Sequence, residues 1–351
     1  MMEKCITEIS VEQSEQWNAT VRSFENYDVF YLNEYVTAFM KEDEKNGVPI
    51  LLLYQNGNDK AINVVFRRDI AKDAKLQGKI FENTYFDLIT PYGYGGFWGN
   101  ISDYKALNGA YNEYCKDKHY ICEFVRFELF GNYHQYYDGE VETRTHNVVR
   151  NLEIPLDDMW MDFRQKVRKN VKKATKNNLQ IIIEKSGEHL QEFLEIYYST
   201  MERSNAEDEY YFSKAFFENL NMMRDNVMYF HVLYEGKIIS TELVIYGAEN
   251  SYSYLGGTNS EYFNMRPNDF LKYEIIKWAH EKGLKNFVLG GGYGADDGIF
   301  QYKTYLAPNG VVDFYIGRKI FDRPTYNELV DIRSEDNPAC RESSYFPRYR
   351  A

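Results

Sequence analysis

The chain has 351 residues, the size of two ordinary domains at roughly 150 residues each. Its residues are 44% hydrophobic and 27% charged, a composition that can bury sizeable cores and excludes disordered and collagen-like classes. The net charge of −12 argues against a general nucleic-acid coat and predicts no DNA partner, because such proteins carry a basic surplus. The 32 tyrosines are the unusual feature, since their apolar rings and polar tips suit core rims, wet clefts and interfaces.

The sequence shows no targeting or metal-binding signal. The start, MMEKCITEIS, lacks the apolar segment of a secretory signal, and no run of about 18 apolar residues predicts a transmembrane segment. The four cysteines form no C-x-x-C pair and the six histidines show no metal-ligand spacing. These features predict a cytoplasmic protein with no bound metal.

The first half predicts a mixed set of helices and strands. In order, these are a helix near 30–45, a hairpin of strands 48–54 and 61–67, a strand near 84–90, a helix near 102–118 and a strand at 120–129. The hairpin turns at Asn56-Gly57-Asn58-Asp59, and the strand near 84–90 leads into a loop rich in glycine and tyrosine at 91–96.

The second half repeats this order after a basic helix. The predicted elements are the basic helix at 159–176, strand 179–184, helices near 188–203 and 213–224, hairpin 227–234 and 238–246, strand 251–255, helix 268–282, strand 286–289, helix 298–306 and strand 311–316. Each half is therefore predicted to contain, in this order, a helix, a hairpin, a strand that ends in glycines, a second helix and a further strand. This predicts a duplicated module, with boundaries at 1–147 and 148–330 and a loosely attached polar tail at 331–351.

The order in the second half is that of the GNAT acyltransferase fold, and four segments sharpen the likeness. They are Asn151-Leu152-Glu153-Ile154-Pro155, the basic run from Arg164 to Ala174, the strand Gly283 to Gly291 that ends in glycines, and Gly298-Ile299-Phe300-Gln301-Tyr302-Lys303. Together they resemble the Fem family of peptidoglycan-bridge aminoacyltransferases. The resemblance implies an α/β fold with mixed sheets, built from two tandem GNAT-like acyltransferase modules.

The resemblance also implies a function. The protein is expected to transfer an aminoacyl or acyl group to an amine of a nucleotide-sugar or lipid-linked peptidoglycan precursor. The acyl donor would be aminoacyl-tRNA or acetyl-CoA, with no cofactor bound tightly. Two alternatives stay open: an acetyl-CoA-dependent N-acetyltransferase acting on an amino sugar, and a non-catalytic module that binds a glycan or nucleotide sugar.

The basic helix is the clearest local charge feature. Arg164, Arg168 and Lys172 follow one another at a spacing of four and share one helix face. Like charges at this spacing repel, so a phosphate-bearing substrate would relieve the strain, and an arginine can grip phosphate with two parallel hydrogen bonds. A solvated helix that balances the acidic surplus of the chain explains the same pattern.

Three residues are candidates for catalysis. By resemblance, Lys303 faces the transfer centre and stabilises the negative charge that develops on the acyl carbonyl, although a surface lysine fits the pattern too. Tyr302 is a candidate acid for the leaving group. Glu242 interrupts an apolar strand and could accept the proton of the attacking amine, whereas alternation along a strand equally predicts a solvent-facing side chain.

The glycine-rich strand ends supply further substrate-binding candidates: Tyr92, Tyr94, Tyr254 and Tyr293. Coenzyme-A-dependent GNAT enzymes bind pyrophosphate on an R/Q-x-x-G-x-G/A loop, but residues 264–270 here read NMRPNDF. Arg266 is the one arginine of this segment and remains a candidate for substrate binding. Asp269 places negative charge in the first turn of the following helix, which disfavours coenzyme A and favours aminoacyl-tRNA.

Overall fold

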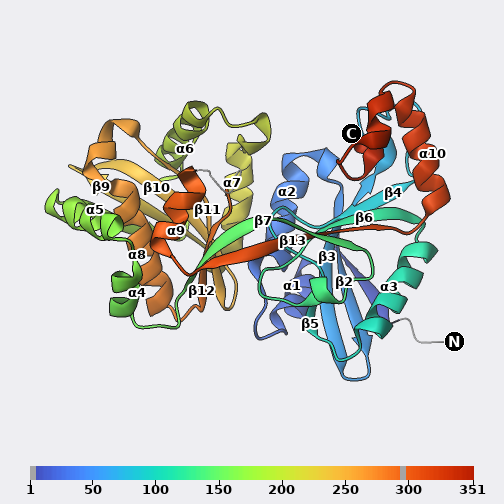
Figure 1. The fold of residues 1–351 in the computed structure, drawn as a ribbon, viewed down its shortest axis with the longest axis horizontal. Helices are drawn as coiled ribbons and strands as arrows, with labels where there is room; N and C mark the ends of the chain where they lie inside the picture. Colours follow the sequence, from blue (N-terminus) through green and yellow to red (C-terminus); the bar gives the residue numbers. More distant parts are fainter. Residues whose placement is uncertain (1–4, 293–297) are drawn as a thin grey trace. The chain divides into compact units, whose positions relative to one another are not determined.

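The computed structural model describes residues 5–292 and 298–351, and the chain divides into two compact units (Figure 1). Unit 1 comprises the residues up to Phe24, Phe30–Arg144 and Phe314–Ala351. Unit 2 comprises Glu25–Val29 and Thr145–Asp313. Two strands, β7 (Glu140–Asn151) and β13 (Val311–Ile320), contain residues of both units. Unit 1 therefore includes the residues from Phe314 to Ala351. The sequence had instead predicted that these residues form the end of the second module and a C-terminal tail.

The sheet of unit 1 has the strand order β1-β2-β3-β4-β6-β13. Its strands are β1 (Ile6–Ser10), β2 (Val48–Asn56), β3 (Asp59–Asp69), β4 (Phe86–Ile89) and β6 (Tyr120–Arg126), and β5 (Trp98–Asn100) pairs with β3. Strands β2 and β3 form the predicted hairpin, in which Asn56 pairs with Asp59. Strands β4 and β6 are parallel and are connected through helix α3 (Tyr104–Asp117).

The last residues of the chain pack into unit 1, so the expectation of a loose polar tail is wrong. Helix α10 (Arg323–Ser334) contributes Leu329 to a buried cluster that also contains Tyr349. The side chain of Arg350 lies 2.7 Å from the carboxylate of Asp87, which is completely buried in β4. A buried carboxylate needs such a partner, and this pairing fixes the end of the chain.

The sheet of unit 2 has the strand order β7-β12-β11-β10-β9-β8. Its other strands are β8 (Gln180–Glu184), β9 (Val227–Tyr234), β10 (Lys237–Tyr246), β11 (Asn250–Thr258) and β12 (Asn286–Gly290). The helices are α4 (Leu156–Asp162), α5 (Gln165–Lys176), α6 (Leu190–Ser204), α7 (Lys214–Leu220), α8 (Pro267–Glu281) and α9 (Gly298–Leu306). Strand β11 runs parallel to β12 and antiparallel to β10.

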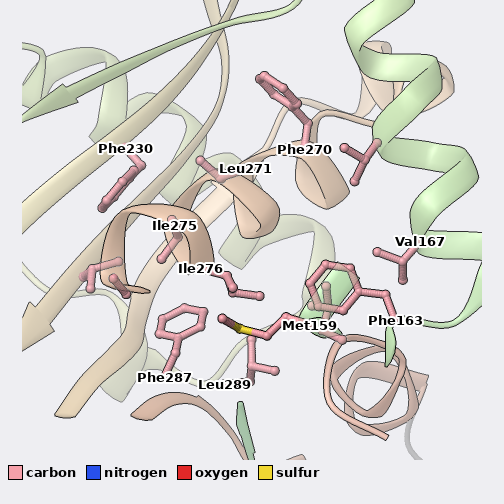
Figure 2. Close-up of a cluster of buried hydrophobic side chains, with 14 of the residues drawn as sticks. Met159, Phe163, Val167, Phe230, Phe270, Leu271, Ile275, Ile276, Phe287 and Leu289 are labelled. Atoms are coloured by element: carbon pink, nitrogen blue, oxygen red, sulfur yellow. The ribbon is translucent and has the colours of Figure 1, made fainter. Parts of the chain in front are cut away.

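Helix α8 supplies the centre of the unit 2 core (Figure 2). Its apolar residues lie at a helical spacing, so that Leu271 and Ile275 reach the sheet. Phe230 and Phe287 meet them from the strands, and Phe163 meets them from the end of α4. The bulky side chains of α8 therefore fix where the polar residues of the same helix lie.

The repeated order of elements is present in both units. Unit 1 runs β1, α1 (Ser14–Arg22), α2 (Asn33–Glu42), β2, β3, β4, α3, β6, and unit 2 runs β8, α6, α7, β9, β10, β11, α8, β12. Strand β1 and helix α1 were not predicted. The predicted basic helix at 159–176 is also corrected, because the chain breaks at Phe163, whose ψ of 141° is extended, and separates α4 from α5.

Candidate functional site

The site in unit 2 begins where the two parallel strands stop pairing. Strand β11 pairs with β12 at three positions that end at Tyr252 and Val288, and β11 then continues to Thr258 along β10. The pairing of β10 with β11 shifts register between Leu243 and Val244, so Tyr254 occupies a bulge. The carboxyl ends of parallel strands are where α/β sheets bind ligands, because the following loops and helix ends meet there.

Lys303 lies at the end of β12. It extends from α9, and its Nζ donates a hydrogen bond of 2.5 Å to the backbone oxygen of Gly291. Gly290 has a φ of +85°, a left-handed conformation that favours glycine, and an added Cβ would lie 3.3 Å from the lysine Nζ. The two glycines let a cation approach the main chain at the strand end, which suits a residue that stabilises developing negative charge.

Glu242 is buried, so the expectation of a solvent-facing strand residue is wrong. Its Oε2 accepts a hydrogen bond of 2.5 Å from Nζ of Lys272, which also donates to Oγ of Ser253 at 2.6 Å. Both charged residues are less than 10% exposed, and the sheet and α8 enclose them. Among the described residues, the second oxygen of Glu242 has no hydrogen-bond partner, so it can accept a proton or a hydrogen bond from substrate.

The charges of Asp269 and Glu242 both act on Tyr302. We call these three residues and their hydrogen-bond partners the buried polar cluster, although three of its members are only half-buried. The cluster consists of Glu242, Lys272, Ser253, Asp269, Asn170 and Tyr302. Asn170 of α5 donates a 3.0 Å hydrogen bond to Asp269. Burial is the main cause that raises the pKa of Asp269 to about 6. Burial, followed by the charges of Asp269 and Glu242, raises the pKa of Tyr302 well above its ordinary value. The Tyr302 hydroxyl, which has no hydrogen-bond partner in the described part of the chain, is therefore protonated at neutral pH and suited to donate.

The basic helix has mixed roles. Arg168 donates hydrogen bonds through one guanidinium nitrogen to the backbone oxygens of Met161 and of Phe163, the latter at 2.8 Å, so it holds the break between α4 and α5. Arg164 is exposed, and its backbone nitrogen donates to the oxygen of Tyr305 at 2.9 Å. Lys172 is also exposed and lies over the ring of Trp160. The proposed contact of these residues with phosphate stays a prediction.

The remaining candidates of unit 2 lie around β11 and α8. Tyr254 is half-buried at the bulge, and the Gly256-Gly257 pair that follows lies within the strand rather than in a loop. Arg266 is exposed, precedes α8 in a left-handed conformation, and its charge acts to lower the pKa of Asp269. A negative charge therefore does occupy the first turn of α8, as the sequence indicated.

Tyr92 and Tyr94 belong to unit 1, where they pack among aromatic side chains. The Tyr92 ring stacks on Phe39 with centroids 5.7 Å apart, and its backbone oxygen accepts a hydrogen bond from Tyr35. Tyr94 meets the rings of Phe30 and Phe314 edge-on. Tyr293 lies outside the described residues. In unit 2, the charges of Glu242 and Asp269 act on Tyr302, and Lys272 is paired with Glu242. Lys303 and Tyr254 belong to the same unit, Lys303 at the end of β12 and Tyr254 in β11.

Lys272 and Ser253 could not be found from the sequence. Lys272 follows two apolar residues of an amphipathic helix, Phe270 and Leu271, and its partner Glu242 lies 30 positions earlier. A metal-binding group near this cluster is not found, but Glu184, His189 and His231 approach one another elsewhere in unit 2, within the part of the chain that is described. Over the same residues, none of the helices has the length and apolar character needed to cross a bilayer.

The first comparison concerns unit 2. Residues 161–304 match the family model described as an acetyltransferase (GNAT) domain. This range contains the basic helix, the ends of β11 and β12, and Lys303. The match lies within unit 2, which is therefore similar to a GNAT domain.

The whole chain has the fold of Fem-type proteins. FemX aligns with a TM-score of 0.70 at 14% identity, covering 92% of this chain and 99% of FemX. L-PGS from Bacillus licheniformis aligns with a TM-score of 0.50 at 11% identity, covering 88% and 96%. These likenesses and the family match confirm the predicted Fem-type fold of two GNAT-like units.

A curated relative is similar over a shorter stretch. A segment of 104 residues is 27% identical to the lipid II:glycine glycyltransferase of Staphylococcus haemolyticus (strain JCSC1435). The match covers 28% of this chain and 25% of the relative, so the chain spans about a quarter of the length of that protein.

Proposed function

We propose that the protein is an acyltransferase that transfers an aminoacyl group to an amine of a peptidoglycan precursor. The observation that supports the proposal is that Lys303, at the end of β12, and the buried polar cluster beside β10 and β11 both lie in the unit that matches a GNAT domain model. The similarity to a lipid II:glycine glycyltransferase supports a lipid-linked or nucleotide-linked precursor as the acceptor. Such a reaction, with an aminoacyl-tRNA donor, belongs in the cytoplasm.

In this proposal, Glu242, Lys303 and Tyr302 each carry out a different part of the reaction. The attacking amine must lose a proton, and the unpartnered oxygen of Glu242 can take it while Lys272 balances the charge of the carboxylate. As the carbonyl becomes tetrahedral, its oxygen becomes negative, and the ammonium of Lys303 stabilises it. Tyr302 stays protonated at neutral pH and can donate to the leaving oxygen. Each step needs positioning and charge stabilisation, which these side chains supply.

The residues at the start of α8 favour one of the two possible acyl donors. Coenzyme A requires a site for its pyrophosphate, and the helix start is where a GNAT domain would hold it. Here Asp269 lies in the first turn, buried, and with a pKa of about 6 it is mostly ionised at neutral pH. Its charge opposes the helix dipole that would attract phosphate, which favours aminoacyl-tRNA over acetyl-CoA as the donor.

The test offers each donor with each class of acceptor. Purified protein is incubated with radiolabelled aminoacyl-tRNA or acetyl-CoA, together with a nucleotide-linked precursor, a lipid-linked precursor or an amino sugar. We expect label from aminoacyl-tRNA on a precursor amine. Transfer from acetyl-CoA to an amino sugar alone would support the N-acetyltransferase instead, and no transfer from either donor would leave a binding module.

A further inference from the structure

Three potential metal ligands meet on the side of the unit 2 sheet opposite to the buried polar cluster. Glu184 ends β8, His231 lies in β9, and His189 precedes the first turn of α6. Side chains alternate along a strand, so His231 and its cross-strand neighbour Thr241 face α6, whereas Glu242 faces α8. This group therefore lies apart from the proposed acyl-transfer chemistry.

The geometry of the three side chains suits a small cation. Nδ1 of His189 is 2.8 Å from one carboxylate oxygen of Glu184, and Nε2 of His231 is 3.3 Å from the other. One ligand atom from each residue lies within 4.8 Å of the other two. Ligands of a tetrahedral zinc ion, with bonds of about 2.0–2.1 Å, lie about 3.3 Å apart, so small side-chain movements would bring these three into place.

The surroundings orient the ligands. The carboxylate of Glu184 accepts a hydrogen bond of 2.9 Å from the backbone nitrogen of His189. Nδ1 of His231 is 2.8 Å from the hydroxyl of Thr241, which can donate or accept. Thr241 can therefore hold the His231 tautomer that carries its proton on Nδ1 and leaves Nε2 free for a metal. Such outer partners are typical of protein metal sites.

Charge and access also favour a cation. Together with Glu184, Glu188 and Glu192 act electrostatically on His189, and Glu184 and Glu192 act on His231, so the local charge at the two imidazoles is negative. The His231 side chain is completely buried, but that of His189 is 34% exposed, which leaves a route for an ion and a solvent ligand. Two nitrogens and one carboxylate favour zinc over magnesium or calcium, which prefer oxygen ligands alone.

We propose that Glu184, His189 and His231 form a zinc site that ties β8, β9 and the start of α6 together. The ion would replace the hydrogen bonds between the carboxylate and the two imidazoles. Its role is to hold the outer edge of the unit 2 sheet, because β8 is the last strand in the order of that sheet.

The test is a zinc titration of the full chain. Protein freed of metal by a chelator is titrated with Zn²⁺ against a chromogenic chelator, and its thermal unfolding is followed with and without Zn²⁺. We expect one ion per chain and a higher unfolding temperature when it is bound. His189→Gln should lower the affinity at least about tenfold, and Thr241→Val, which keeps all three ligands, by about 10- to 100-fold.

His146→Gln is the matched control. His146 also pairs with a carboxylate, Asp313, at 3.0 Å, but that pair is half exposed and belongs to no group of three potential ligands among the described residues. Its zinc affinity should equal that of the wild type. The proposal is overturned if the wild type binds no zinc at a one-to-one ratio, or if folded His189→Gln binds zinc as tightly as the wild type. Circular dichroism of each variant shows that it is folded.

Discussion

Lys303 and Glu242 illustrate how charge is placed at the level of single residues. The ammonium of Lys303 meets a backbone oxygen at the end of β12, and the carboxylate of Glu242 is held by the buried Lys272. The first cation is half-buried and lies at a strand end, whereas the second is enclosed between sheet and helix. These environments assign charge stabilisation to Lys303 and the positioning of a carboxylate to Lys272.

Replacement of Lys303 by methionine tests the role of its charge. Methionine keeps much of the length of the side chain, so the substitution removes the cation with little change in packing. We expect Lys303→Met to lower kcat about 100- to 1,000-fold with little change in substrate affinity, because the charge acts on the transition state. Steady-state kinetics with the donor and acceptor found in the transfer assay measure both quantities.

Lys282→Met is the matched control, since Lys282 is exposed at the end of α8. It should keep the wild-type kcat. A Lys303→Met enzyme with the wild-type kcat would remove Lys303 from the chemistry and leave its bond to Gly291 as a structural contact.

Part of this site could be predicted from the sequence. The Tyr302-Lys303 pair could be recognised in the sequence, because a motif consists of residues that are neighbours along the chain. Lys272 is not visible, because its burial depends on how α8 lies on the sheet, and a lysine on an amphipathic helix ordinarily faces solvent. Arg168 looked like a phosphate ligand, yet its guanidinium binds backbone oxygens at a break that the continuous helical pattern conceals.

At the level of elements, the close approach of α6 to β11 depends on glycine. An added Cβ at Gly257 would lie 2.2 Å from Oγ1 of Thr200 and 2.8 Å from the backbone oxygen of Ile196. In sequence, a glycine pair such as Gly256-Gly257 after a strand is also typical of a loop that lets the backbone approach a ligand. The structure gives Gly257 a packing role instead, which sequence could not reveal because the helix that covers it lies more than 50 residues earlier.

Gly257→Ala should therefore destabilise the protein. The backbone oxygen of Ile196 cannot move without a shift of α6, so we expect a loss of about 1–3 kcal/mol in the free energy of unfolding. Gly109→Ala is the control, because it lies within α3 and an added Cβ meets no described atom within 4 Å. That variant should gain about 0.5–1 kcal/mol, as alanine favours helix. Urea unfolding measures both, and equal stabilities would contradict the packing role.

At the scale of the whole molecule, the order of helices and strands could be predicted from the sequence, but the structure at the two ends of the chain could not. Hydrophobic periodicity and the glycines after strands predict the shared order of both units. Helix α1 has a polar composition and strand β1 is short, so neither gave a clear pattern. The C-terminal residues are polar, which predicts exposure, but Arg350 is buried through its ion pair with Asp87, 263 positions away.

Buried carboxyls make the stability of the two units depend on pH in opposite directions. In unit 2, burial raises the pKa of Asp269 to about 6, and it likewise raises that of Asp28 to about 6. In unit 1, burial acts to raise the pKa of Asp87, but the charges of Arg350 and Arg68 hold it below its ordinary value. A raised carboxyl pKa costs stability as pH rises through the interval between its unfolded and folded values, whereas a lowered pKa adds stability above the unfolded value.

Two substitutions by asparagine separate these effects. Asp269→Asn removes a carboxyl that is neutral at pH 4 and charged above pH 6. The free energy of unfolding of this variant, relative to that of the wild type, should therefore rise by about 3 kcal/mol over that range. Asp87→Asn should instead destabilise the protein at neutral pH by about 3–5 kcal/mol, because Arg68 and Arg350 lose their partner. That loss should shrink as pH falls below about 4, because the unfolded wild-type chain then binds a proton at Asp87, whereas the folded state, with its lowered pKa, does not. Urea unfolding of the three proteins from pH 4 to pH 7, extended to pH 3 for Asp87→Asn, measures both trends. Parallel stability curves for wild type and Asp269→Asn would contradict a raised pKa for Asp269, since a carboxyl that titrates alike in both states leaves no pH-dependent difference.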